Sequence, residues 1–174
     1  MLAAVTESII AGGVSDVVVV TRSEIATLLA DVLRHLAVVV YNDDPTTEMI
    51  HSIRLGLNAA KVSMPLAPHD GVMVVPGDQP GIPPACIRQC AEEFKAHPAD
   101  MVIAAWRDRP GHPLVFPADL APFVQSSHCD SGLRAMPKAF PHRVRMLESD
   151  APAVVRDIDT VVDYGSLLLD PGGT

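Results

Sequence analysis

Three aspartates occupy positions that suit a divalent metal ion. Asp78 follows the apolar run of residues 72–75 and lies between a glycine and a glutamine-proline pair. Asp157 and Asp159 are two residues apart, so on a strand their side chains project to the same side. If the two strands are neighbours, three carboxylates converge at one strand-end crevice, and oxygen ligands of this kind suit Mg²⁺. The alternative is that Asp78 caps the helix opening near Pro83, and that the other two acids are solvated.

A histidine in the second half is a further candidate. Residues 111–113 read Gly-His-Pro, which predicts a tight turn that carries the imidazole of His112. An imidazole there can position a phosphate or act as a general acid or base, or it can be an ordinary polar loop group. Residues 128–130 read His-Cys-Asp. They are either a weak cluster of metal ligands or ordinary polar residues of a loop that precedes Gly132.

The three cysteines bear on both location and metal binding. They are odd in number and contain no C-x-x-C pair, which is typical of a reduced, cytoplasmic protein rather than a disulfide framework. Cys86 and Cys90 share one face of an expected helix and could form half of a metal site. Burial against a sheet is the interpretation we favour, because free cysteine behaves as a small hydrophobic residue.

Composition excludes several classes of protein. The chain has 174 residues and a formal net charge of −8, and its 13 Lys and Arg residues are scattered, so we expect no nucleic-acid partner. No apolar stretch approaches the ~20 residues of a membrane helix. The first seven residues lack the basic region of a signal peptide. Hydrophobic residues make up 48% of the chain, enough for the core of a single domain over residues 1–174.

Strand-like and helix-like segments alternate along the chain. No hairpin dipeptide joins the early strands, so the alternation predicts an α/β fold with a mostly parallel sheet between helices. Asp44 should cap the third helix, and residues 117–142 should form short helical pieces. Expected strands cover residues 16–21, 36–41, 72–75, 100–106, 144–147 and 153–158, and expected helices cover 2–11, 23–33, 45–57, 84–94 and 164–169.

Four motifs together resemble a known family. They are G-D-Q-P at residues 77–80, G-H-P-L-V-F at 111–116, D-S-G-L-R at 130–134 and D-I-D-T at 157–160. Their order and spacing resemble the MobA-like nucleotidyltransferases, and more narrowly the molybdenum cofactor cytidylyltransferases and their relatives encoded near xanthine dehydrogenases. The resemblance implies a three-layer α/β/α fold of the nucleotide-diphospho-sugar transferase type.

The resemblance also implies a reaction and its partners. An acceptor phosphate, on a molybdopterin-like pterin-dithiolene, attacks the α-phosphorus of CTP or GTP and releases pyrophosphate, with Mg²⁺ or Mn²⁺ as the cofactor. A molybdoenzyme is then an expected partner. The implied site residues are Asp78, Asp157 and Asp159 for catalysis and metal binding; Asn42, Ser52 and Gln79 for the nucleotide; and Gly111, His112 and Arg134 for the acceptor.

The nucleotide end departs from the family pattern. That pattern opens with a strand and the loop L-A-A-G-x-S-x-R-M-G-x-x-K, whose backbone N–H groups, Arg and Lys hold the triphosphate, and this sequence contains no such motif. Glu48 takes the place of a glycine in the base-binding turn, and residues 161–163 read V-V-D instead of P-E-D. We therefore expect a weak or inactive enzyme, or alternatively a non-catalytic binding or assembly module. A second copy of the chain is expected to cover the place of the missing first strand.

Overall fold

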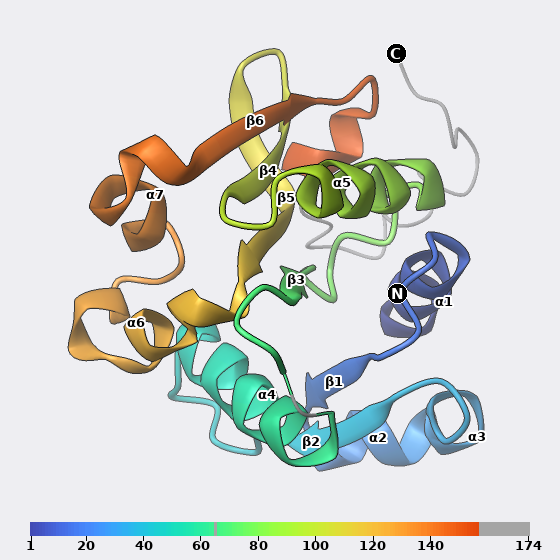
Figure 1. Ribbon diagram of the computed structural model, residues 1–174. Coiled ribbons are helices and arrows are strands. Elements are labelled where there is room, and N and C mark those ends of the chain that lie inside the picture. Colours follow the sequence, from blue (N-terminus) through green and yellow to red (C-terminus); the bar gives the residue numbers. More distant parts are fainter. Residues whose placement is uncertain (65, 157–174) are drawn as a thin grey trace.

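The computed structural model describes residues 1–64 and 66–156 (Figure 1). Strands and helices alternate in its first half, and shorter helical pieces occupy much of its second half. The strands are β1 (Val18–Thr21), β2 (Val38–Tyr41), β3 (Gly71–Val74), β4 (Met101–Trp106), β5 (Arg109–Pro117) and β6 (Val144–Glu148). The α-helices are α1 (Leu2–Ala11), α2 (Ser23–Leu28), α3 (Ala30–Leu33), α4 (Met49–Ser63), α5 (Pro84–Ala96), α6 (Ala121–Gln125) and α7 (Ala135–Ala139), and the 3₁₀ turns are η1 (Ala118–Leu120), η2 (Ser127–Cys129), η3 (Pro141–Arg143) and η4 (Pro152–Val155).

The strands form two hydrogen-bonded groups. β1 and β2 pair in parallel, and the second group has the order β3-β5-β4-β6. Within it, β5 is antiparallel to both neighbours, whereas β4 and β6 are parallel, so β3, β4 and β6 share one direction. β2, α4 and β3 follow one another as a strand–helix–strand crossover, the connection that parallel strands use. The fold is therefore the expected mixed α/β arrangement with a largely parallel sheet.

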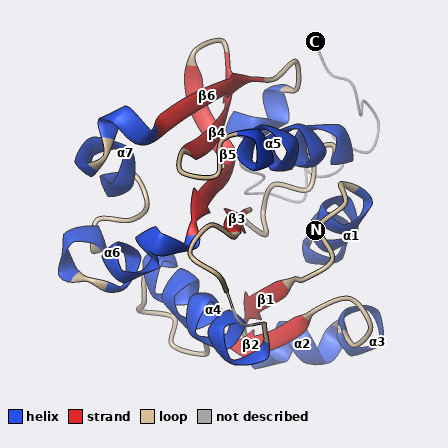
Figure 2. Cartoon of the chain, viewed as in Figure 1, coloured by secondary structure: helices blue, strands red, loops and turns tan. Residues whose placement is uncertain are grey.

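Helices cover both faces of the strands (Figure 2). Alternate residues of β4 point to opposite faces: Met101 and Ile103 join a core cluster with α4 and α6, whereas Val102 and Ala104 join a cluster with α5. α1 lies on the α5 side, where its residues pack near β1. The three-layer arrangement is consistent with the sequence-based expectation.

Helix α4 packs on both groups of strands. Its Leu57 belongs to the core beneath β4 and β5. Its Gly56 faces β1 so closely that a Cβ there would lie 3.2 Å from Val20 and 4.0 Å from Val18. One helix therefore spans the space between β1 and β3.

Two helix predictions need correction. The segment 23–33 is divided into α2 and α3 at Leu29, whose φ of −109° and ψ of 11° leave the helical region, and Leu28 before the break is 83% exposed. Asp44 does not cap α4. Its carboxylate accepts hydrogen bonds from the backbone N–H and hydroxyl of Thr46, which form a local turn, and α4 begins only at Met49.

Two strand predictions also need correction. Residues 153–156 of the expected strand 153–158 belong largely to the 3₁₀ turn η4, which opens with Pro152, and the remaining two lie outside the described residues. The run 72–75 was expected to be a strand of a mostly parallel sheet, but it is half-buried and its partner β5 is antiparallel. Among the described residues, the edge of β3 opposite β5 has no strand partner and borders a cavity, which explains the exposure. Within the described residues, no helix combines the length and the apolar character needed to cross a membrane.

Candidate active site

Asp78 lies in a turn just beyond the carboxyl end of β3. Pro76 and Gly77 end the strand, and the backbone N–H of Gln79 donates to the carbonyl of Pro76 at 3.4 Å. The carboxylate of Asp78 is exposed, whereas Gln79 is only 3% exposed. The hydroxyl of Ser8 donates to the carbonyl of Ile82 at 2.6 Å, which fixes the end of this turn against α1. Asp78 thus presents its carboxylate to solvent from a fixed loop.

His112 belongs to β5, not to a turn. The turn between β4 and β5 is made instead by Arg107 and Asp108, whose φ angles are 51° and 61°. The antiparallel register pairs Val74 with Leu114, so His112, two residues earlier in β5, lies beside the turn that carries Asp78. His112 is half-buried. The structure therefore brings Asp78 and His112 to the same edge of the sheet.

Gly111 makes a close backbone contact with η4. A Cβ added there would lie 1.9 Å from the carbonyl oxygen of Val154, so only glycine allows the two backbones to approach. Asp157 and Asp159 follow η4 by a few residues and lie outside the described residues. Gly111 thus positions the segment that leads to those two aspartates, and its proposed contact with an acceptor stays a prediction.

We expect Gly111→Ala to destabilise the protein by about 1–3 kcal/mol, because the methyl group forces η4 away from β5. Urea unfolding followed by circular dichroism measures this change. Gly77→Ala is the matched control, since within the described part of the chain its Cβ meets the flexible end of Leu2, at 3.2 Å. Equal stability of the two variants would contradict the packing role of Gly111.

A second part of the site is a cavity of about 220 Å³ at the carboxyl ends of β1 and β2. Asn42 and Ser52 both line it, from the end of β2 and the first turns of α4. The amide of Asn42 donates to the hydroxyl of Ser52 at 2.9 Å and to that of Thr47 at 3.0 Å. The two residues that the resemblance assigns to the nucleotide are thus in direct contact.

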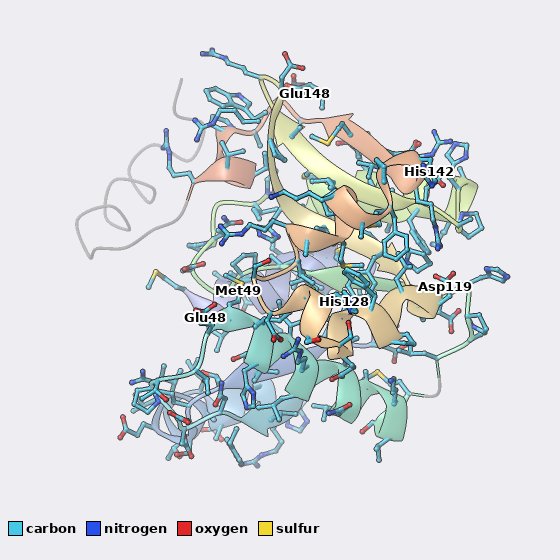
Figure 3. All side chains as sticks on the ribbon, turned by 90° about the vertical axis from the view of Figure 1, so that its left-hand side faces the viewer. Glu48, Met49, Asp119, His128, His142 and Glu148 are labelled. Carbon is cyan, nitrogen blue, oxygen red and sulfur yellow. The ribbon has the colours of Figure 1, made fainter. Side chains whose placement is uncertain are left out.

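Three acidic residues lie in or next to the segment that borders this cavity, and Asp44 is one of its lining residues. Asp43 accepts a hydrogen bond from the backbone N–H of Ser23 at 2.7 Å. The hydroxyl and backbone N–H of Thr46 lower the pKa of Asp44 by hydrogen bonding its carboxylate. Figure 3 shows Glu48 next to Met49 at the start of α4, where both are exposed. These carboxylates oppose the approach of a triphosphate, and Arg22 is a cation that lines the cavity.

The D-S-G-L-R motif has a structural role in the described residues. Asp130 forms an ion pair with Arg54 of α4 at 2.7 Å, and the same guanidinium donates to the carbonyls of Val124 and Ser126 at 2.9 and 2.7 Å. Arg134 is exposed at the start of α7 and donates to the carbonyl of Ser131 at 3.0 Å. The sequence did not predict this role of Arg54, because neither its residue type nor its position on an amphipathic helix indicates which distant residues it contacts.

The cysteine-containing candidates are part of the core. Cys86 and Cys90 are buried in the cluster between α5 and the sheet. A hydrogen bond from Cys90 lowers the pKa of Cys86 to about 7, and that bond together with burial raises the pKa of Cys90. Cys129 is buried as well, and burial raises its pKa. The burial interpretation therefore agrees with the structure.

Among residues 1–64 and 66–156, no group of three His, Cys, Asp or Glu side chains could hold a metal ion. Asp78 is a ligand of the right chemical class for Mg²⁺ or Mn²⁺, and it is accessible. The further carboxylates of the expected set, Asp157 and Asp159, lie outside the described residues.

Solved structures of other proteins share this architecture. Rv0371c from Mycobacterium tuberculosis H37Rv is 25% identical, with a TM-score of 0.78 over 97% of this chain and 82% of that one. Its complex with manganese gives 24% identity and a TM-score of 0.73 over 97% and 85% of the two chains. A nucleotidyl transferase from Methanothermobacter thermautotrophicus is 25% identical, with a TM-score of 0.72 over 95% of this chain and 77% of that one. The search of curated proteins yields no match.

One of these structural neighbours, the protein from Methanothermobacter, is a nucleotidyl transferase. Residues 1–144 match the model of the MobA-like NTP transferase domain, and the chain belongs to that family. The match supports nucleotidyl transfer as the class of activity.

Proposed function

We propose that the protein transfers a nucleotidyl group from CTP or GTP to the phosphate of a molybdopterin-like acceptor, with Mg²⁺ or Mn²⁺ as cofactor. The observation that supports the proposal is that the residues in question follow strands: Asp78 lies just beyond the carboxyl end of β3 beside His112, and Asn42 lines a cavity at the carboxyl ends of β1 and β2. Ligands bind at the carboxyl ends of strands in open α/β sheets.

Each part has a chemical task in this proposal. Asp78, with Asp157 and Asp159, holds the metal, which when bound offsets the negative charge on the phosphates. Asn42 and Ser52 exchange their mutual hydrogen bond for bonds to the nucleotide. His112 donates a hydrogen bond to the acceptor phosphate. The manganese complex of Rv0371c, a protein of the same fold, supports the choice of a divalent cation.

Two features of the sequence limit the rate of nucleotidyl transfer in this proposal. The sequence has no Gly-rich loop of the family pattern to hold the β- and γ-phosphates, and Asp43, Asp44 and Glu48 place negative charge near the nucleotide cavity. We therefore propose that the 174-residue chain alone is a weak or inactive transferase.

Asp78→Asn tests the metal site. Divalent cation bound to the folded state raises the unfolding free energy by about 2.7 kcal/mol at a hundredfold excess over Kd. We expect Mg²⁺ or Mn²⁺ to raise the unfolding midpoint of the original chain but not that of Asp78→Asn. Asp31→Asn is the control, because Asp31 is exposed on α3 and pairs only loosely with Arg34 at 3.6 Å. If the cation leaves the unfolding midpoint of the original chain unchanged, or raises that of Asp78→Asn equally, Asp78 is not a metal ligand.

A second candidate function is a non-catalytic binding or assembly module that retained the fold. A cavity of about 1090 Å³ between β1 and β3 favours this candidate, because it offers a large binding region that extends from Ser52, at the nucleotide cavity, to Gly77. Pyrophosphate release distinguishes the two: the transferase releases it from CTP or GTP when an acceptor is present, and the module does not.

A further inference from the structure

Arg54 joins α4 to the end of α6 and to the segment that follows it (Figure 1). Its Nε donates to the carbonyl of Val124 at 2.9 Å. A terminal nitrogen of the same guanidinium donates to the carbonyl of Ser126 and to the carboxylate of Asp130, both at 2.7 Å. In the other direction, the side-chain amide of Gln125 donates to the carbonyl of Arg54 at 3.2 Å. One guanidinium therefore holds three points of the chain between residues 124 and 130.

The segment from α6 to α7 consists of short helical pieces. α6 and α7 have five residues each, and η2 has three. Helices of this length are marginal by themselves, and the last carbonyls of α6 have no partner within the helix. Cys129 and Leu133 bury the segment against the core, but apolar contact is not directional. The hydrogen bonds of Arg54 therefore set where the segment lies along α4.

The two side chains assigned to the acceptor belong to the face of the sheet that α4 covers. Gly111 faces η4, on the side of α5, so its neighbour His112 points to the other face of β5. That face carries the core cluster shared with α4 and α6. Leu133 joins the same cluster, and Arg134 follows it as an exposed residue. His112 and Arg134 therefore lie on the same side of the sheet as Arg54.

Helix α4 carries a nucleotide contact as well. Ser52 precedes Arg54 by two residues, lines the cavity beside Asn42 and accepts a hydrogen bond from the amide of Asn42 at 2.9 Å. Buried apolar residues such as Leu57 fix α4 in the core. The helix is thus a rigid link between the nucleotide cavity and the segment 126–134.

We propose that Arg54 is a positioning residue for the acceptor. It holds the segment that carries Arg134 against α4, so that the acceptor phosphate lies at a fixed distance from the nucleotide bound beside Ser52. This inference rests on the proposed function, in which His112 and Arg134 bind the acceptor phosphate. Arg54 acts through Arg134, and its effect is large because a misplacement of about 1 Å between reacting groups costs on the order of 10²-fold in rate.

Hydroxymethylpterin phosphate, a fluorescent pterin that carries a phosphate ester, is the probe, and fluorescence anisotropy with the 174-residue chain measures its binding. We expect Arg54→Ala to weaken binding by at least about tenfold, because the displaced Arg134 loses a charge-assisted hydrogen bond to the phosphate. CTP affinity should stay unchanged. Amide hydrogen exchange should become faster in residues 126–134 and stay the same in α4. Arg54→Lys should bind with intermediate affinity, because a lysine keeps the charge but not the planar fork of donors.

Arg143→Ala is the matched control. Arg143 pairs with Asp119 at 3.0 Å and donates to the carbonyl of Ala99 at 2.6 Å, and its side chain is 24% exposed, against 22% for Arg54. It lies just before β6, at the amino ends of β4 and β6 and therefore at the opposite edge from Asp78. Both variants should lose stability in urea, but we expect pterin phosphate binding to weaken in Arg54→Ala alone.

Equal weakening of pterin phosphate binding in the two variants would overturn the proposal, as would unchanged exchange in residues 126–134 or an equal loss of CTP affinity in Arg54→Ala. Circular dichroism confirms that the variants are folded. If the original chain binds the pterin phosphate and Arg54→Ala binds it equally well, the role of Arg54 fails while the proposed function stands. If the original chain does not bind it, the proposed acceptor fails, and the role of Arg54 toward that acceptor fails with it.

Discussion

Joining a strand and Gly-rich loop of the family pattern ahead of Met1 should raise nucleotidyl transfer by on the order of 10⁴-fold over the 174-residue chain. Each donor aimed at developing charge is worth a factor of about 10²–10³, and the loop supplies an Arg, a Lys and backbone N–H groups together. Correct positioning of the reacting groups contributes roughly 7–11 kcal/mol in favourable cases. We expect the joined strand to enter the cavity between β1 and β3, because in the described residues each of these strands has one edge without a strand partner.

Pyrophosphate release from CTP and from GTP, with a molybdopterin-type acceptor, measures this effect. A fusion that carries the strand without the loop is the first control, and one with the loop Arg and Lys replaced by Ala is the second. Both should remain near the rate of the shorter chain. A family-like rate from the 174-residue chain alone would contradict the argument that phosphate positioning limits it.

Phe116→Ala should lower the free energy of unfolding by about 3–5 kcal/mol, the second large effect we expect. Phe116 is fully buried on β5, in the core cluster that joins the sheet to α4 and α6. It stands opposite Val72 in the ladder between β3 and β5, the pair of strands that holds Asp78 beside His112. Removal of the ring leaves a cavity in the core beneath the β3–β5 pair of strands.

Denaturant unfolding gives the difference directly. Met146→Ala is the control, because Met146 is 49% exposed on β6 and should change stability little. If Phe116→Ala lowers the free energy of unfolding no more than this control does, the β3–β5 pair does not depend on the core beneath it.

Much of the fold follows from local signals. Four unbroken β-branched residues at 17–20 and a similar run at 38–40 predict strands, and both are present. Pro84 opens α5 as expected of a proline at the first helical turn. The errors arose where other contacts competed with these signals. The Asp44 side chain forms a turn with Thr46 instead of a helix cap, and residues 152–155 form a 3₁₀ turn whose backbone packs against Gly111.

The site could be predicted only in part. Residues that follow strands, such as Asp78 and Asn42, are foreseeable, because strand ends in an α/β sheet meet at one edge. The strand position of His112 and the contact of Gly111 with Val154 depend on long-range pairing, which no short motif encodes. The same holds for Arg54, whose partners lie about 70 residues later in the chain.

The most direct test of the central claim is a crystal structure of the chain with Mn²⁺ and CTP, read by the anomalous signal of manganese. The account predicts a manganese peak within about 2.5 Å of a carboxylate oxygen of Asp78, with the nucleotide base in the cavity beside Asn42 and Ser52. Manganese bound elsewhere, with the turn at Asp78 empty and the nucleotide away from that cavity, would contradict the account.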